Sequence, residues 1–577
     1  MMDVDEALTS PRPSFRAAFG SSLLLTIFLT HHLLNGFGGG LVFQAMDFTY
    51  RGLKVDGPTL QVLTAVARLP FSMKALMGLV SDGFPLCGRR KAPYLFIATV
   101  AAVAAFFFLG FASTPSTQST TGCLFAIFFQ MALADLLVEA KYSEKVKTMP
   151  ERGPELLTFV SCGVSVLNLI STICAGALLQ NYGTRICYLL ALPMAALLLW
   201  PVACNHLEEE RIPGSRRFGP DLQNWRGKGF IPFMLALASG LAALILLVCS
   251  LLIKSVTVNF LVALSLGMLN LALLSCFLRP VIAKINAFYF LQSIFHIGTH
   301  GAAFYFFTDT EESYRDGPHF SYQFYVTGMG CVAAGCSLLG AGCYNLLAKK
   351  WTYRSMLMST SLAYALANGL SVIAYKRVNI KYGIPDAGFM LASSAMQTVL
   401  GQLAWMPMTV MLAQLVPQGL ESVMYALLSA SLSLGFAVAN YGGALVLSLL
   451  GVTPNGAVHE DAKFENLWIA ALLSACGPCV PLFLVRILIP EGRQTDRLLE
   501  LDAGSATAGS LFERMCGRVD EMGDQMEYQH AEEELTELTW VRSALQSSSL
   551  GREPSLDASR ETRGQLSAEK FSLAATS

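Results

Sequence analysis

The chain contains 577 residues, of which 53% are hydrophobic and only 14% are charged. Soluble domains carry about 25% charged residues, and a mean hydropathy of +0.50 is too high for a water-soluble chain of this length. The 40 basic and 41 acidic residues nearly cancel, so the basic excess of a nucleic-acid-binding protein is missing. The composition predicts an all-α polytopic membrane protein and excludes most soluble enzymes and nucleic-acid-binding proteins.

A helix needs about 20 apolar residues to cross a bilayer. The candidate span 59–80 is the weakest one, because it contains Arg68 and Lys74. The fourteen candidates, in chain order, are 22–46, 59–80, 94–113, 122–140, 156–181, 185–204, 230–253, 256–278, 281–307, 320–347, 354–375, 386–413, 419–449 and 466–489.

Lys and Arg residues are enriched in cytoplasmic loops, which gives an expected orientation. With the N-terminus in the cytoplasm, the inner segments hold about 22 basic residues and the outer segments about 9. Lys376, Arg377 and Lys381 are exceptions on the outer side. We therefore expect both termini to be cytoplasmic. The default location is the plasma membrane and the alternative is an organellar membrane, because residues 574–577 carry no retention or peroxisomal signal.

Two stretches lie outside the predicted spans. Residues 206–229 form a charged loop. Residues 491–577 are rich in Ser, Glu and Gln and poor in large apolar residues, a composition typical of disorder. Within them, 519–545 has the pattern of a short amphipathic helix. A solvated tail is favoured over a regulatory one.

Three short motifs recur in the same order in the two halves, at offsets of about 265, 259 and 266 residues. Parallel repeats are typical of the major facilitator arrangement. We predict two six-helix bundles with an extra central helix pair, which gives 12–14 spans in total. In chain order the segments are a cytoplasmic segment 1–21, a bundle 22–205, a charged cytoplasmic loop with two inserted spans 206–278, a bundle 279–490 and a tail 491–577. The paired motifs are His31–Gly36 with His296–Gly301, Arg90–Tyr94 with Lys349–Tyr353, and Pro150–Glu155 with Pro417–Glu421.

The loop after the second span contains Gly78, Asp82 and then Arg89 and Arg90. This spacing resembles the cytoplasmic signature of the major facilitator superfamily. Gly78 would let helices pack closely, and the charged residues would clamp the two halves together when a cytoplasmic gate closes. The alternative is an ordinary basic cytoplasmic loop.

Glu155 and Glu421 begin the fifth and thirteenth predicted spans. A carboxylate is favoured at a helix N-terminus by the helix dipole. The residues are therefore either simple helix caps or part of the cytoplasmic gate, paired with Arg89 or Arg90.

A longer stretch around this loop resembles the folate–biopterin transporter family of the major facilitator superfamily. The similarity runs in order through residues 22–490. Phe71 and Ala75 replace a Trp and a Pro of the family pattern. The segments that carry the resemblance are Pro70–Lys74, Gly78–Leu95, Ala134–Tyr142, Phe306–Thr308 and Leu415–Ser422.

This resemblance implies a secondary active transporter of folates and pterins that works by alternating access and is coupled to protons. Some members of the family carry S-adenosylmethionine, so this cargo, or an amino acid, is the alternative. The resemblance implies a small-molecule substrate, protons and the lipid bilayer as partners. A membrane receptor or scaffold that acts through the C-terminal tail is a more remote alternative.

Charged residues within spans cost free energy and need a reason. Asp135 and Glu139 lie four residues apart in the fourth span, where two neighbouring carboxylates suit a coupling proton or a cationic ligand group. Arg68 and Lys74 of the second span suit a dicarboxylate substrate, because a guanidinium binds carboxylate in a bidentate manner. The alternative is structural ion pairing between helices. Glu139 could also lie at the cytoplasmic edge of its span, and Lys74 could extend to the inner membrane surface.

His296 and His300 are expected to share one face of a continuous ninth span, opposite His31 and Asn35 of the first span. Histidine titrates near neutral pH and can carry a proton or bond a pterin edge. The alternative is ordinary helix packing.

No cofactor and no metal is expected. The two histidines lack evident third and fourth zinc ligands. Cys476–Cys479 spells a thioredoxin-type motif, but it lies in an apolar span, where redox activity is not expected. No Walker A loop occurs, so ATP-driven pumping is not expected either.

Overall fold

The computed structural model describes residues 15–149, 152–207, 209, 230–344, 346, 351–415, 421–493 and 506–515. Each of the fourteen predicted spans corresponds to a helical segment in this part of the chain, and eleven of these helices are long and apolar enough to cross a membrane. The other three segments are Ser21–Gly52, Pro280–Thr308 and Asp386–Gln414. The protein is thus a multi-pass, almost entirely helical membrane protein.

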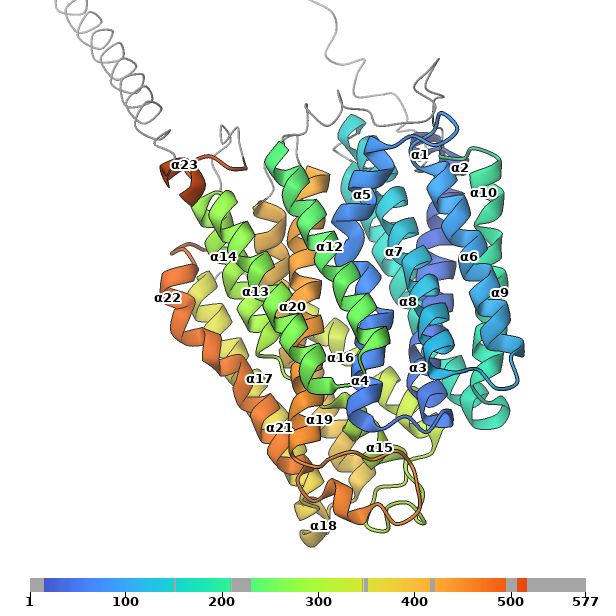
Figure 1. Cartoon of the computed structure of the whole chain (residues 1–577), viewed down its shortest axis with the longest axis vertical. Coiled ribbons are helices and arrows are strands. Elements are labelled where there is room, and N and C mark those ends of the chain that lie inside the picture. Colours follow the sequence, from blue (N-terminus) through green and yellow to red (C-terminus); the bar gives the residue numbers. More distant parts are fainter. Residues whose placement is uncertain are drawn as a thin grey trace, which may run out of the picture. The chain divides into compact units, whose positions relative to one another are not determined.

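The N-terminal bundle contains six spans, which run side by side in Figure 1. The first span packs on the fifth, the third packs on the fourth and the sixth, and the second packs on the fourth. Its elements are α1 (Phe15–Phe19), α2 (Ser21–Ile27), η2 (Phe28–Gly38), α3 (Gly39–Gly52), α4 (Gly57–Ala67), η3 (Leu69–Met73), α5 (Lys74–Gly83), α6 (Ala92–Phe111), α7 (Thr117–Thr148), α8 (Gly153–Tyr182), α9 (Thr184–Leu197) and α10 (Leu199–Ala203).

The C-terminal bundle repeats these pairings with its own six spans: α14 packs on α20, α17 packs on α19 and α21, and α16 packs on α19. This is the two-bundle arrangement of a major facilitator protein. Its elements are α14 (Pro280–Ile294), α15 (His300–Thr308), η6 (Phe324–Gly328), α16 (Met329–Cys343), α17 (Tyr353–Tyr375), α18 (Val378–Lys381), α19 (Asp386–Gln414), α20 (Glu421–Leu449), η8 (Asp461–Phe464), α21 (Leu467–Cys476), η9 (Gly477–Leu484) and α22 (Val485–Leu488).

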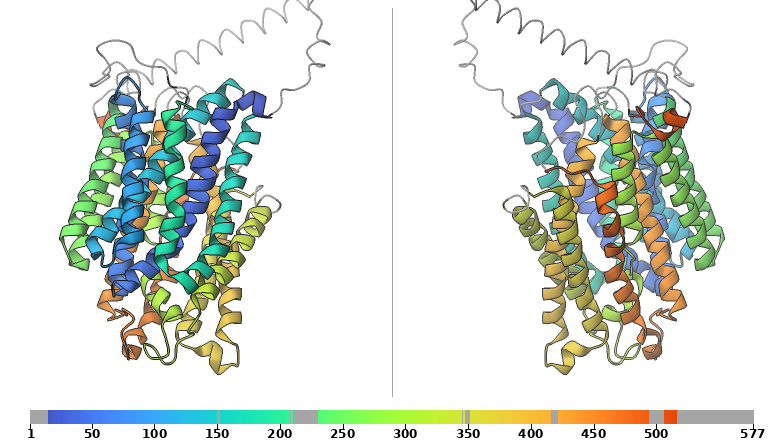
Figure 2. Two further views of the ribbon diagram at one scale, coloured as in Figure 1. Left: turned by 90° about the vertical axis from the view of Figure 1, so that its right-hand side faces the viewer. Right: turned by 90° about the vertical axis from the view of Figure 1, so that its left-hand side faces the viewer.

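The inserted pair, α12 (Phe230–Leu252) and α13 (Val256–Phe277), contacts both bundles. α12 packs on α4 and α5, and both inserted helices pack on α20. The pair lies at one face of the helix assembly in the two side views (Figure 2). Its outward side chains are apolar and exposed, including Leu241, Ile245 and Leu261, so this face is suited to lipid.

A separate unit begins at Leu511, and only α23 (Leu511–Met515) is described there. The amphipathic helix predicted at 519–545, most of the tail 491–577 and most of the charged loop 206–229 lie outside the described residues.

Several of the described spans are not regular α-helices, and three of these contain predicted site residues. η2 interrupts the first span with a π-helix, and Pro70 lies in the 3-10 turn η3 that divides the second span. The ninth span is unwound at residues 295–299, between α14 and α15. π-Helical turns and broken spans occur frequently at functional sites of membrane proteins.

The two bundles are tightly joined at one end, which we call the closed end and which lies near α15 in Figure 1. There Gln61 is fully buried and donates hydrogen bonds of 2.8 Å to the carbonyls of Gly298 and Asn440. It also accepts a bond of 3.3 Å from the amide of Gly301. A Cβ on Gly443 would lie 1.9 Å from the carbonyl oxygen of Gly298, so only a residue without a side chain fits.

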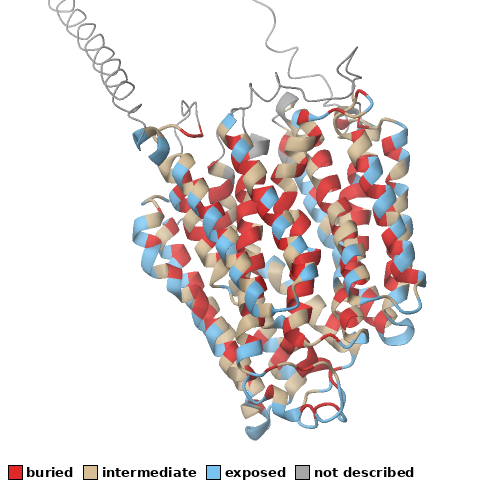
Figure 3. Ribbon diagram, viewed as in Figure 1, coloured by how far each residue is buried: buried red, intermediate tan, exposed pale blue. Residues whose placement is uncertain are grey.

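Arg51 adds a charged link at the closed end. Its guanidinium forms an ion pair of 2.9 Å with Asp309 and donates bonds of 2.9 and 2.8 Å to the carbonyl and hydroxyl of Thr308. The Tyr305 hydroxyl donates a bond of 2.5 Å to the carbonyl of Val55. Phe48 packs edge to face on Phe304. Much of the chain at this end is buried (Figure 3), and these contacts link the two bundles there.

Two of the basic residues that violated the charge rule have partners nearby. Lys376 lies over the Trp468 ring, 3.6 Å from its centroid, and Arg377 forms an ion pair of 2.7 Å with Asp386. Lys381 is exposed.

Replacing Gly443 by Ala should lower the free energy of unfolding by about 1–3 kcal/mol, because the added methyl group overlaps Gly298 and forces the ninth and thirteenth spans apart. Thermal unfolding of the purified protein in detergent measures the change. Gly342→Ala in α16 is the matched control, since a Cβ there meets no atom within 4 Å. Equal stability of the two variants would contradict the close packing.

Candidate functional site

Asp135 of α7 is the centre of a polar cluster inside the N-terminal bundle. One of its oxygens accepts a charged bond of 2.5 Å from Lys74, and the other lies 3.1 Å from His31 Nδ1 and 3.4 Å from Asn35 Nδ2. The π-helix η2 brings both His31 and Asn35 to this carboxylate. The structure thus joins four predicted site residues from three spans, and the Lys74–Asp135 contact is the ion pairing considered as an alternative.

Glu139 lies one helical turn beyond Asp135 and is partly accessible. It interacts electrostatically with Lys74, His31 and Asp135. Tyr425 of α20 interacts electrostatically with Glu139, Lys74 and Asp135, and 45% of its surface is exposed. The cluster therefore reaches the interface with the C-terminal bundle.

Arg68 lies at the C-terminus of α4, where the second span breaks. Its guanidinium stacks over Phe43 at 5.1 Å and interacts electrostatically with Asp47 and His300. The side chain is exposed although protein surrounds it on most sides, as expected for a group that lines an accessible space inside the protein. His300 completes this second group through a contact of 3.2 Å between its Nε2 and the Thr64 hydroxyl.

The expectation that His296 and His300 share one helical face is wrong. The ninth span is unwound between them, and its carbonyl at Gly298 bonds Gln61 of the second span instead of the next turn. The unwinding separates the two side chains. His296 stacks on Tyr364 with ring centroids 5.7 Å apart and lies edge-on to Phe436 at 6.2 Å.

This aromatic group lies in the C-terminal bundle and has an accessible surface. Trp405 lies 6.4 Å from Phe436 and is 41% exposed. His296 is exposed as well. The site thus has charged groups on one bundle and mostly aromatic groups on the other.

The predicted gate residues lie at the end opposite the closed end. Asp82 is in the last turn of α5, and Arg89 follows in a tight turn closed by two backbone bonds with Leu86. Gly78 of α5 faces Leu136 of α7. Glu155 forms an ion pair of 3.0 Å with Arg152, at the start of its own helix. Arg90 lies in the same turn as Arg89, and Glu421 begins α20.

Lys91 extends this region by pairing with Glu144 at 2.9 Å, while Glu209 caps α6 through the amides of Lys91 and Ala92. Arg354 pairs with Glu491. Each of these contacts joins elements of the same bundle.

Sequence reasoning missed Asp47, Phe43, Tyr364, Phe436 and Tyr425. Asp47 lies one residue beyond the predicted end of the first span, whereas the helix continues to Gly52. A test for charged residues at each span end would have found it. The aromatic residues carry no local signal, because most aromatic residues in apolar spans face lipid or core.

Comparisons with known proteins show the family and the fold of the chain. The model of the BT1 family matches residues 35–505. The chain belongs to the BT1 family. Among curated relatives, "Probable folate-biopterin transporter 2" of Arabidopsis thaliana is 25% identical over 80% of this chain and 81% of its own length. The "Folate-biopterin transporter" of Synechocystis is 23% identical over 78% of this chain and 79% of its own length.

Solved structures show the same fold. A POT family transporter in complex with 5-aminolevulinic acid matches with a TM-score of 0.56, 14% identity, and coverage of 81% of this chain and 96% of that one. A peptide transporter POT in complex with sulfate matches with a TM-score of 0.55 and 14% identity, over 85% and 99% of the two chains. This BT1 family member is thus a membrane transporter with a major facilitator fold.

Lys74→Gln alone should destabilise the protein more than Lys74→Gln combined with Asp135→Asn, because the single change leaves an enclosed carboxylate without its cation. A double-mutant cycle by thermal unfolding should give a coupling energy of about 1–3 kcal/mol. The control cycle replaces Lys91 and Glu144, whose carboxylate side chain is 58% exposed, and should give less than about 1 kcal/mol. Similar coupling in both cycles would contradict a special role for the enclosed pair.

Proposed function

We propose that this protein is a secondary active transporter that carries folate- or pterin-type substrates by alternating access and is coupled to protons. The observation that carries the proposal is the accessible juxtaposition of cationic and carboxylate groups on one bundle with aromatic groups on the other. The names of the relatives support the cargo, and the shared fold supports the mode of transport.

The chemistry of the two groups fits a folate or pterin. Arg68 is an accessible guanidinium that can bind a substrate carboxylate in a bidentate manner. His296, with Tyr364 and Trp405, offers ring faces and edges for a planar heterocycle. We assign the carboxylate tail to the Arg68 side and the ring to the His296 side.

The contacts of the closed end support alternating access. The charge distribution favours an outer location for residues 51–57 and a cytoplasmic location for both termini, in the plasma membrane by default or in an organellar membrane. The closed end is then the outer gate, and the structure is an inward-facing state. Opening to the outside requires that Gln61 and Arg51 release their partners, while Asp82, Arg89, Arg90, Glu155 and Glu421 close the cytoplasmic end.

Protons are the coupling ions that the side chains support. Glu139 and Asp135 lie near the interface of the bundles, next to His31. One charge crossing 100 mV is worth about 2.3 kcal/mol, which supports roughly 40-fold accumulation of a neutral substrate.

The alternative cargo is S-adenosylmethionine or an amino acid, whose cationic groups would be attracted to Glu139. The remote alternative is a receptor or scaffold that acts through the tail after residue 490. Removal of that tail should leave uptake intact in a transporter.

Uptake of labelled folate, biopterin and S-adenosylmethionine into cells at about pH 5.5 and 7.5 tests the cargo and the coupling. We expect saturable uptake of folate or biopterin that is stimulated by acid. Glu139→Gln should lose the acid stimulation. Arg68→Lys should raise KM for folate about tenfold, because a bidentate contact worth about 1.4 kcal/mol is lost.

Lys381→Gln is the control for these variants, because this exposed lysine at the end of α18 belongs neither to the site nor to either gate. Its uptake should equal that of the unchanged protein. Uptake of none of the three compounds, with the protein present at the cell surface, would contradict the cargo. Undiminished acid stimulation in Glu139→Gln would contradict its role in coupling.

The outer gate should respond to pH through Asp309, which follows the end of α15. The pKa of Asp309 is raised to about 7, chiefly by burial, while Arg51 opposes the rise. Glu460 also raises this pKa, and His319 lowers it. The carboxylate is ionised and paired with Arg51 above this pH, and it takes up a proton as the pH falls below it. Acid outside should therefore loosen the gate.

Asp309→Asn should flatten the pH dependence of initial uptake within about one unit of pH 7, because the variant cannot lose the ion pair on acidification. The rate is measured in cells across a pH series. Asp386→Asn is the matched control, since Asp386 pairs with Arg377 within the C-terminal bundle. An unchanged profile in Asp309→Asn would contradict the gate role.

A further inference from the structure

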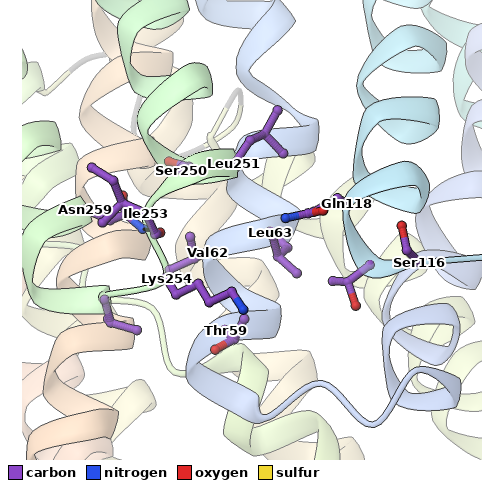
Figure 4. A pocket seen from close by; sticks show the side chains of 12 residues that line it. Thr59, Val62, Leu63, Ser116, Gln118, Ser250, Leu251, Ile253, Lys254 and Asn259 are labelled. Atoms are coloured by element: carbon purple, nitrogen blue, oxygen red, sulfur yellow. Dashed lines mark hydrogen bonds between the residues drawn. The ribbon is translucent and has the colours of Figure 1, made fainter.

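A crevice of about 460 Å³ lies between the turn of the inserted pair and the N-terminal bundle (Figure 4). Its walls come from the first two turns of α4, the start of α7, the end of α12 and the start of α13. It is distinct from the site around Asp135 and Arg68, and none of its lining residues belongs to the predicted site.

Positive groups from three elements lie at the crevice, beside the carboxylate of Asp56. Two long helices, α7 and α13, begin at it, and each is capped by a neutral serine, Ser116 or Ser255. Their positive dipole ends are therefore not offset by a capping carboxylate, whereas α4 is capped by Asp56. The exposed ammonium group of Lys254 adds a full positive charge at the rim.

Asn259 supplies a second, independent polar group at the crevice. It is only 3% exposed, and its Nδ2 donates a bond of 2.9 Å to the carbonyl of Ile253. Its Oδ1 is buried and accepts no hydrogen bond within the part of the chain that the structure describes. Such a buried acceptor is costly unless a donor reaches it, and Asn259 lines the crevice.

The remaining wall is apolar and continuous with a lipid-facing surface. Val62, Leu63 and Leu251 line it, while Leu252 and Val258 beside it are 77% and 41% exposed. Three residues with hydroxyl groups, Thr59, Ser116 and Thr117, also line the crevice. One face of the crevice thus suits a hydrocarbon chain, and the other suits an anion.

We propose that this crevice binds one phospholipid whose headgroup carries a hydrogen-bond donor, as in phosphatidylglycerol. Lys254 and the helix ends hold the phosphate, Asn259 Oδ1 accepts from the headgroup hydroxyl, and an acyl chain lies along Val62 and Leu63. Phosphatidylcholine offers the same phosphate but no donor for Asn259.

The position gives the lipid a structural role. The inserted pair contacts α4 and α5 of one bundle and α20 of the other. Ser250, at the crevice, bonds Tyr441 of α20 at 2.6 Å. A lipid held here connects the turn of the pair to α4 and α7.

The test is thermal unfolding of the purified full chain in detergent, titrated with phosphatidylglycerol, with phosphatidylcholine of the same acyl chains, and with glycerol phosphate. Phosphatidylglycerol should raise Tm at lower concentration than phosphatidylcholine. In Lys254→Gln the concentration for half the effect should rise about fivefold, as for loss of one exposed charge contact. Lys381→Gln, an exposed lysine on α18, should behave like the unchanged protein.

Three results would overturn the proposal. An equal rise in Tm with phosphatidylglycerol for the unchanged protein and Lys254→Gln would contradict binding at this crevice. An equal rise with phosphatidylglycerol and phosphatidylcholine would contradict the role of Asn259. A response to glycerol phosphate as strong as that to the lipid would show a site for free anions.

Discussion

The buried side-chain amide of Gln61 joins the second, ninth and thirteenth spans at the closed end. The unwound segment 295–299 exposes carbonyl and amide groups that a continuous helix would have paired internally, and an unpaired backbone group is costly away from water. Gln61 pairs with two of these groups, the carbonyl of Gly298 and the amide of Gly301. It also donates a hydrogen bond to the carbonyl of Asn440 in α20. The same break frees His296 and His300 from helical geometry and directs them to the accessible interface. The closed end and the candidate site therefore both depend on the unwinding of one helix.

Charge is distributed unequally between the bundles, and this asymmetry organises the site. In the N-terminal bundle the carboxylate of Asp135 is paired with the ammonium group of Lys74. Arg68 interacts with the more distant Asp47 and with neutral or aromatic neighbours. The C-terminal bundle contributes mainly rings at the corresponding level. A ligand with an anionic end and a planar end is complementary to both bundles only when it lies across them, which is the condition for a substrate to influence their relative position.

Much of this could be predicted from the sequence. The fourteen spans follow from hydropathy, and the paired bundles follow from repeated motifs because each repeat must bury the same faces. The polar residues in apolar spans that form the cluster could each be predicted: His31, Asn35, Lys74 and Asp135. Their mutual contacts could not, because they depend on the π-helix η2, which no residue pattern predicts. The histidine pair was misread because an i, i+4 spacing implies a shared face only where the helix is continuous. Arg51 and Asp309 are separated by 258 positions, and nothing local indicates that they meet.

The inserted pair has a mechanical consequence. α12 is fitted to the N-terminal bundle where Gly240 lies against Leu76, and α13 is fitted to the C-terminal bundle where Gly267 lies against Val438. The two helices are joined by their short turn and by a bond of 2.6 Å between Ser239 and Asn270. In the proposed transport cycle, rocking of the bundles would have to slide or bend this hairpin, because it is packed on both of them. A stiff hairpin would then restrict how far the bundles separate.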